Sequence, residues 1–346
     1  MVAPNPDAGE TRYRISIADT GLFFEIGEQD TLLGGMLRSG IGVPYECNAG
    51  GCGSCKFTLF EGEVFDDLEN TTGLRPADRR KNKHLSCISH ARSDCVIGIR
   101  PDAAYEPEIR PCRITAVFES SETLTHDLRE FRFRSEAAAR FLPGQYAKVG
   151  IPGVPGPRSY SMSNTANADG VWAFQVKRVP DGAASNVLFE TELKGMKVTI
   201  DAPYSIAHLR VESQRSLVCI AGGSGLAPMV SILHGFAEQH GAADTPTLYY
   251  GARTAEDVVD TDYFLRIAGF DSEIQYVPIV SQPDAGTGWS GPTGLVHEYL
   301  ARALPGDCSN IDFYIAGPPP MVDAVRRHLV LERNVPVDHL YYDRFF

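Results

Sequence analysis

The stretch PYECNAGGCGSCKF, residues 44–57, gathers three cysteines within nine positions: Cys47, Cys52 and Cys55. Thiols crowded in this way either pair with one another or hold a common ligand. A disulfide between Cys52 and Cys55 would make a CxxC redox motif, but such a motif normally opens a helix beside a βαβ unit. Here the stretch lies between a predicted short helix at 31–41 and a predicted strand within 55–64. Zinc would need a fourth ligand and usually takes two separated pairs.

The spacing Cys-x4-Cys-x2-Cys is instead that of plant-type ferredoxins, which need one distant cysteine to complete a [2Fe–2S] cluster. Two cysteines follow at a suitable distance, Cys87 and Cys95. Cys87 comes after a short apolar approach and resembles the fourth ligand of that family. Residues 8–102 therefore resemble a plant-type ferredoxin domain, which is a small β-grasp fold. We expect Cys95 to be a small buried residue in or near a core strand.

Three glycines of the cysteine stretch fit the same interpretation. A cluster held by one loop needs backbone in unusual conformations, with amides turned toward the sulfur atoms. Gly50, Gly51 and Gly53 allow both. The spacing and the glycines together favour an iron–sulfur cluster over structural thiols or zinc.

Composition limits the remaining choices. The chain has 346 residues, 43% of them hydrophobic, and no run approaches the roughly 18 apolar residues that a membrane span needs. The first residues lack the basic and apolar regions of a secretory signal, so we expect a cytoplasmic protein whose thiols stay reduced. The net charge of −12 argues against nucleic acid as a partner.

After prolines at 101, 107 and 111, strand-like segments at 112–120, 128–135, 144–151 and 172–179 predict an antiparallel β-barrel over 108–211. The barrel contains RSYS, in which Arg158 and Ser159 precede Tyr160 and Ser161. Arg158 can fork onto a phosphate, Tyr160 can lie on a flavin ring, and Ser161 can face its reactive edge. Gly182 and Ser185 begin a predicted helix whose amides suit a pyrophosphate. By itself RSYS would be an ordinary strand with a hydroxyl face.

From residue 212 to 346, apolar strands alternate with helices, which predicts a doubly wound α/β domain with a parallel sheet. Its first strand ends in a glycine turn, and a later strand ends in AGPPPM at 316–321. A glycine turn alone is equally an ordinary strand–helix connection. We expect the two loops to follow adjacent strands and to close over a bound cofactor at the carboxyl edge of the sheet. The loop residues concerned are Gly222, Gly223, Ser224, Gly225, Gly317 and Pro318.

RSYS, placed between PGQY and GAAS, and the two C-terminal loops resemble the ferredoxin–NADP reductase superfamily. With the ferredoxin domain first, the order is that of oxygenase reductases that contain FAD. The resemblance implies that electrons pass from NADH through FAD and the cluster to an external acceptor. It also implies that the flavin and the nicotinamide carry the chemistry and that no side chain acts as acid, base or nucleophile. One departure is Ala316, where the family often has cysteine.

The terminal YYDRFF looks most like reductases of toluene and alkene monooxygenases, and Phe346 is then expected to cover the flavin. The resemblance thus implies an oxygenase component or an intermediate ferredoxin as partner, with a soluble di-iron monooxygenase first, no membrane contact and a monomeric chain. Reductases of Rieske dioxygenases or of a cytochrome P450 are the alternatives, and a non-enzymatic electron-transfer module is a remote one. NADH is expected over NADPH because one cation, Arg253, is followed by four carboxylates: Glu256, Asp257, Asp260 and Asp262.

Overall fold

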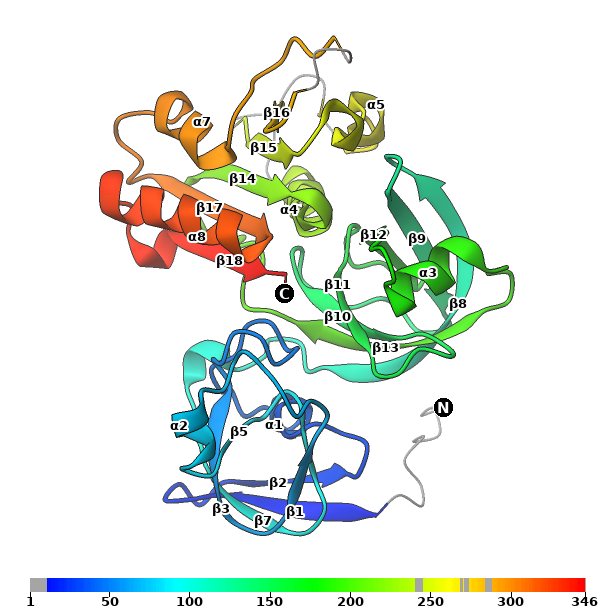
Figure 1. The fold of residues 1–346 in the computed structure, drawn as a ribbon, viewed down its shortest axis with the longest axis vertical. Helices are drawn as coiled ribbons and strands as arrows, with labels where there is room; N and C mark the ends of the chain where they lie inside the picture. The colour runs from blue at the N-terminus through cyan, green and yellow to red at the C-terminus, as the bar shows by residue number, and fades with distance from the viewer. Residues whose placement is uncertain (1–10, 240–244, 268–269, 271–273, 284–287, 346) are drawn as a thin grey trace. The chain divides into compact units, whose positions relative to one another are not determined.

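The computed structural model describes residues 11–239, 245–267, 270, 274–283 and 288–345. The chain forms two compact units, one reaching to Cys112 and the other running from Arg113 to Phe345 (Figure 1). In the described part of the chain, no helix has both the length and the apolar character needed to cross a membrane. Cys112, the last residue of the first unit, is exposed and begins a long strand. The predicted limits 8–102, 108–211 and 212–346 stay predictions.

The first unit is built on a five-stranded sheet in the order β2-β1-β7-β3-β5. Strands β1 and β7 are parallel, and the other neighbours are antiparallel. A separate two-stranded antiparallel sheet pairs β4 with β6. The elements are β1 (Arg12–Ile17), β2 (Phe23–Gly27), α1 (Leu32–Arg38), β3 (Lys56–Glu61), β4 (Val64–Asp66), α2 (Pro76–Arg79), β5 (Lys83–Leu85), β6 (Ser89–Ala91) and β7 (Cys95–Gly98).

Helix α1 confirms the predicted short helix and shows why it forms where it does. The hydroxyl of Thr31 accepts a hydrogen bond from the Gly34 amide at 3.1 Å, which caps the first turn. Leu32, Leu33 and the rest of the helix as far as Leu37 are buried. The helix is thereby fixed on the sheet, and the cysteine stretch leaves it to reach β3.

The second unit begins with a six-stranded antiparallel sheet, in the order β11-β10-β13-β8-β9-β12. A bridge between Met162 and Phe174 joins its two edges, so the sheet closes into the predicted barrel. We call it the barrel half. Its elements are β8 (Cys112–Thr123), β9 (Leu128–Ser135), β10 (Tyr146–Gly150), β11 (Arg158–Ser161), β12 (Val171–Lys177), α3 (Ala183–Glu190) and β13 (Lys197–Tyr204).

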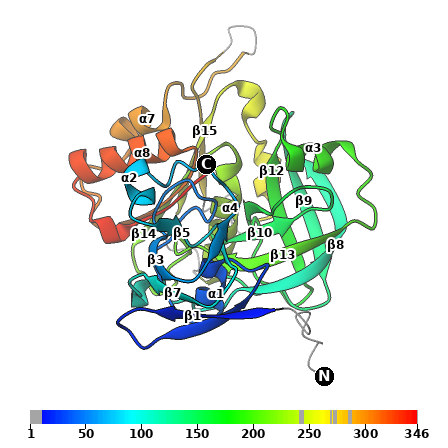
Figure 2. The same ribbon diagram turned by 60° about the horizontal axis from the view of Figure 1, so that its bottom comes forward.

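The remainder of the second unit, the α/β half, is a parallel sheet in the order β16-β15-β14-β17-β18. Alternate residues of β14 face opposite sides: Cys219 packs with α4 and α5, whereas Ile220 packs with α7 and α8. Helices therefore cover both faces (Figure 2), as a doubly wound fold requires. The elements are β14 (Ser216–Gly222), α4 (Leu226–Gln239), β15 (Thr247–Ala252), α5 (Thr261–Phe264), β16 (Gln275–Val280), α7 (Val296–Ala303), β17 (Ile311–Gly317), α8 (Pro319–Arg327) and β18 (Leu340–Arg344).

Candidate functional site

The four predicted cluster ligands come together in the first unit. Cys47 and Cys52 lie on the loop between α1 and β3, Cys55 lies at its end, and Cys87 lies between β5 and β6. The amide of Cys52 donates to the Cys47 sulfur at 3.3 Å, and the amide of Ser54 donates to the Cys52 sulfur at 3.5 Å. Backbone donors aimed at sulfur fit an iron–sulfur cluster, because they stabilise the charge on ligating thiolates.

The sulfur atoms influence one another as pairs. The pKa of Cys52 is lowered to about 5, chiefly by a hydrogen bond from Cys47. The pKa of Cys55 is lowered by a bond from Cys87 more than burial raises it. The hydrogen bond with Cys52 and burial raise the pKa of Cys47, so one thiol of that pair loses its proton before the other. All four thiols must lose their protons to ligate iron. Two linked pairs suit a two-iron cluster, in which each iron takes two protein sulfurs.

A second loop supports the cysteine loop. Gly50 has a φ of +79°, and its carbonyl accepts hydrogen bonds from the Thr71 hydroxyl and from the Gly73 amide. Thr72 donates to the Gly51 carbonyl at 3.1 Å. A methyl group at Gly53 would lie 2.5 Å from the Gly73 carbonyl oxygen, so that position also requires glycine. Threonines are common in loops, so no sequence pattern predicts this role for Thr71 and Thr72.

Cys95 lies in strand β7 and not in the loop that carries Cys47, Cys52 and Cys55. It is buried in β7, as expected, and its thiol donates to the Glu63 and Ser93 carbonyls at 3.5 and 3.3 Å. Burial raises its pKa, in contrast to Cys52 and Cys55. These contacts support its exclusion from the ligand set, which stays a prediction.

The predicted flavin-binding strand is β11 on the barrel. Ser161 is buried, and its hydroxyl has no hydrogen-bond partner in the described part of the chain. A buried unpartnered hydroxyl is costly and is the kind of group that a bound flavin would satisfy. The Tyr160 ring lies 6.4 Å from that of Phe174, and burial raises its pKa to about 12, so it stays a neutral phenol. These residues fit FAD.

The other two residues of RSYS are exposed. The guanidinium of Arg158 donates to three carbonyls of the preceding loop, those of Pro155, Gly156 and Pro157, at 3.0 to 3.3 Å. A phosphate would have to compete with these carbonyls for it. Ser159 points to the opposite side of the strand from Arg158 and Tyr160, so its side chain lies on the same face as that of Ser161.

Helix α3 begins as predicted, with Gly182 as its N-cap. The Ser185 hydroxyl accepts from the Val179 amide at 3.1 Å and lies 3.2 Å from the Gly182 carbonyl. The serine side chain therefore shapes the turn before the helix. Its role toward a pyrophosphate is left to backbone amides, which is what the sequence predicts.

The two glycine loops of the α/β half meet, because β14 and β17 are adjacent and parallel. A methyl group added to Gly225 would lie 2.2 Å from the Ala316 carbonyl oxygen, and one added to Gly222 would lie 2.5 Å from the Met321 sulfur. Gly223 has a φ of +56° and opens a 3₁₀ turn, Gly223–Gly225, that leads into α4. Such a close loop pair at the carboxyl edge of a parallel sheet fits a dinucleotide.

Three other residues complete the account of these loops. Ser224 lies in the same 3₁₀ turn, and Pro318 is the N-cap of α8. Ala316 is fully buried beside the loops, in the position where the family often has cysteine. Phe346 lies outside the described residues, although the preceding Phe345 amide donates to the Gly317 carbonyl at 3.0 Å.

The four carboxylates that follow β15 differ in how far they are buried. Asp257 is buried and accepts from the Thr254 amide at 2.9 Å, so it caps a local turn. Burial raises its pKa, but the Thr254 bonds and the charges of Lys177 and Arg253 lower it overall. Asp260 is the N-cap of α5. Glu256, Asp260 and Asp262 are exposed, whereas Asp257 belongs to the structure of the turn.

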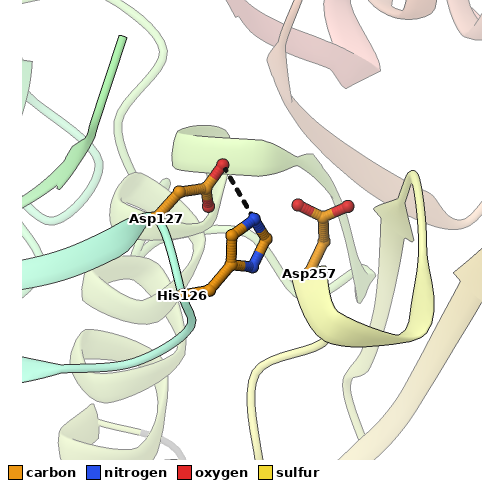
Figure 3. Close-up of side chains that lie close together, drawn as sticks. All are labelled: His126, Asp127 and Asp257. Atoms are coloured by element: carbon orange, nitrogen blue, oxygen red, sulfur yellow. Dashed lines mark ion pairs between the residues drawn. The ribbon is translucent and has the colours of Figure 1, made fainter. Parts of the chain in front are cut away.

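His126, Asp127 and Asp257 form the one group of metal-ligand type whose ligand atoms lie within 4.8 Å of one another in the described ranges (Figure 3). His126 comes to 3.6 Å from the Asp127 carboxylate. Lys177 already supplies a cation, with its ammonium 3.0 Å from Asp127 and 3.4 Å from Asp257. The group is therefore an ion-pair junction between the barrel half and the α/β half.

Three family models match the chain in the predicted order. The 2Fe-2S iron–sulfur cluster binding domain matches residues 15–92, the oxidoreductase FAD-binding domain matches 115–208, and the oxidoreductase NAD-binding domain matches 219–327. These matches confirm the three cofactor classes and the fold classes inferred from the sequence.

Relatives match over almost the full length. The ferredoxin–NAD(P)+ reductase CarAd of Metapseudomonas resinovorans is 38% identical over 92% of this chain and 96% of its own. The ferredoxin–NAD+ reductase component of the alkene monooxygenase system of Xanthobacter autotrophicus is 36% identical over 94% and 98%. The solved ferredoxin reductase in carbazole 1,9a-dioxygenase has a TM-score of 0.90 and 34% identity over 97% and 99%.

Proposed function

The chain belongs to the family of ferredoxin–NAD(P)+ reductases of oxygenase systems, and from this premise we propose that it takes electrons from NADH and delivers them to a separate small ferredoxin. It is an oxidoreductase with FAD-binding, NAD-binding and [2Fe–2S] domains. FAD, when bound, would supply the chemistry that links acceptance of a hydride to release of single electrons. The full-length match to CarAd is the observation that carries this proposal.

The residues of the chain divide this work. Cys47, Cys52, Cys55 and Cys87 would hold the cluster, with the amides of Cys52 and Ser54 stabilising charge on sulfur. Ser161 and Tyr160 would orient the flavin, and α3 would offer amides to its pyrophosphate. The Gly222–Gly225 and Gly317–Pro318 loops would hold the coenzyme beside it. The role of the chain is to bind and orient these groups and to exclude oxygen.

Three oxygenase classes compete as the final acceptor, and a cytochrome P450 is the third of them, on the structural match to a cytochrome P450 reductase. We take a soluble di-iron monooxygenase as the first candidate, on the similarity of the terminal YYDRFF and on the relative from an alkene monooxygenase system. The structural match to a reductase of a carbazole dioxygenase favours a Rieske dioxygenase as the second. We further propose a monomer that works in the cytoplasm.

The proposal is tested with the purified holoprotein, NADH and two acceptors offered separately, a small [2Fe–2S] ferredoxin and a di-iron hydroxylase. Fast NADH-dependent reduction of the ferredoxin, with slow reduction of the hydroxylase, is the expected result. Direct and fast reduction of the hydroxylase would reject the intermediate ferredoxin. No NADH oxidation with any acceptor would reject the reductase function.

A further inference from the structure

A buried carboxylate lies where the barrel half meets the α/β half. Glu130 of β9 is 1% exposed, and Gln175, its partner across β12, is 2% exposed. Their neighbours Phe131 and Phe174 face the barrel core, so both polar side chains lie on the outer face of the barrel. An outer face is normally in water, and here the other half of the unit covers it.

The α/β half hydrogen-bonds this carboxylate through the side chain of Tyr263 in α5. Its hydroxyl donates to Glu130 Oε2 at 2.6 Å and accepts from Gln175 Nε2 at 2.7 Å. Burial and the Glu130 charge raise the pKa of Tyr263 well above its usual value, so the phenol keeps the proton that it donates. The hydroxyl is thus held from two strands of the barrel at once.

The carboxylate is satisfied from every side. Ser163, which follows the predicted flavin strand, donates to Glu130 Oε2 at 2.8 Å. Arg132 donates twice to Oε1, at 2.9 and 3.1 Å, and Arg266 of the α/β half lies 3.6 Å from the same atom. A buried charge with this many donors has one favourable arrangement, because any displacement would leave it undercompensated.

Two further buried contacts join the halves at other strands. Ser231 of α4 donates to the Asn164 carbonyl at 2.7 Å and accepts from the Gly144 amide at 3.2 Å. Asp343 of β18 accepts from Ser205 at 2.9 Å. Helices α4 and α5 follow β14 and β15, whereas β18 is an edge strand, so the three contacts are spread across the sheet (Figure 1).

We infer that Tyr263 is a positioning residue for hydride transfer: its bond to Glu130 fixes the orientation of the α/β half on the barrel. The inference rests on the proposed function, in which the coenzyme bound by one half reduces the flavin bound by the other. Other contacts also join the halves, among them Lys177 with Asp257 and Arg266 with Glu122. The Tyr263 contact differs from these two because it is buried and is held from two barrel strands, so its loss should loosen the seating of α5 on the barrel. The rate of hydride transfer depends steeply on that orientation, whereas coenzyme affinity depends on loops that Tyr263 does not contact.

The test is Tyr263→Phe, which removes one hydroxyl and keeps the ring in its core. Anaerobic single-turnover reduction of the flavin by NADH is followed by stopped flow. We expect the limiting rate constant to fall about tenfold with the Kd for NADH within about twofold of wild type. Tyr13→Phe is the matched control, because it removes another tyrosine–glutamate bond, Tyr13 to Glu28 at 2.9 Å, within the first unit. It should leave both constants unchanged.

Hydrogen–deuterium exchange gives a readout that needs no turnover. Peptides covering α5 should exchange faster in Tyr263→Phe than in wild type. In Tyr13→Phe their exchange rate should equal that of wild type. A lowered melting temperature with an unchanged limiting rate, or unchanged exchange in α5, would overturn the inference and leave the proposed function standing. Failure of the wild-type protein to reduce its flavin with NADH would overturn both.

Discussion

Ser205, which follows β13, holds the buried carboxylate of Asp343 in β18 through a hydroxyl that lies 2.9 and 3.1 Å from its two oxygens. Ser205 has a φ of +92°, a backbone conformation that residues other than glycine rarely adopt. The same hydroxyl accepts from the Ala207 amide at 2.9 Å. The hydrogen bonds of the Ser205 hydroxyl therefore offset the backbone strain at this position.

This relationship predicts opposite contributions from backbone and side chain. Ser205→Ala keeps the strain and loses the bonds, so it should lower the free energy of unfolding by about 2 kcal/mol. Ser205→Gly loses the same bonds but relieves the strain, and should cost about 1 kcal/mol less than alanine. Urea unfolding followed by flavin release measures both. A glycine variant less stable than the alanine variant would contradict the strain argument.

The cluster ligands give a second prediction. Cys87→Ser should abolish the visible absorption of the cluster and lower iron and sulfide below two each per chain. Cys95→Ser, the matched control in a buried strand, should keep both. Iron, acid-labile sulfide and FAD per chain are measured chemically in both variants and compared with wild type. Loss of iron from Cys95→Ser with retention in Cys87→Ser would reverse the assignment of the fourth ligand.

The order of electron flow gives a third. With FAD bound but no cluster, Cys87→Ser should still reduce ferricyanide with NADH at a rate close to wild type. Reduction of cytochrome c should become slow, because it needs single electrons from the cluster. FAD content and circular dichroism confirm that the variant is folded. Equal rates of cytochrome c reduction in the two proteins would argue that electrons leave from the flavin.

Coenzyme preference gives a fourth. The exposed Glu256, Asp260 and Asp262 lie after β15, where a 2′-phosphate would be read, and like charges repel there. We expect kcat/KM to favour NADH over NADPH by about tenfold or more. Glu256→Gln should narrow this ratio, whereas Asp94→Asn in the first unit should not. An equal or greater kcat/KM for NADPH in wild type would refute the prediction.

His208 gives a prediction on pH. Burial and the neighbouring Arg210 lower its pKa to about 4, and Arg210 donates to His208 Nε2 at 2.5 Å. The unfolded imidazole takes up a proton below pH about 6.5 and the folded one only below about 4. Stability should therefore fall as pH drops through this window, by on the order of 3 kcal/mol. His208→Gln should flatten the slope of urea stability against pH between these values; an unchanged slope would count against it.

Patterns with a local physical cause could be read from the sequence. The cysteine spacing, the period of β9, the glycine turn after β14 and the short helix α1 all lie where expected, because each depends on neighbours in the chain. The segment patterns predict neither β13 nor β18: Gly195 lies in the turn between α3 and β13, and β18 lies in the terminal motif.

Side chains whose role depends on a distant partner could not be read. Glu130 reads as an exposed strand residue until Tyr263, 133 positions later, is placed on it. The sequence places Asp257 in one acidic run with Glu256, Asp260 and Asp262, although Lys177 and Thr254 hold its carboxylate in the structure. In both cases the residue that buries or pairs the carboxylate lies on another element, so the local sequence pattern cannot predict it.

Cys112 has a practical consequence for experiments on this chain. It is the exposed cysteine of the set, since the others are partly or fully buried, and it stands at the border of the two units. A maleimide dye or spin label should modify this thiol first in the holoprotein, without any engineered substitution. Because the label sits where the ferredoxin unit joins the flavin-containing one, its mobility would report whether the two units reorient between reduction by coenzyme and delivery of an electron.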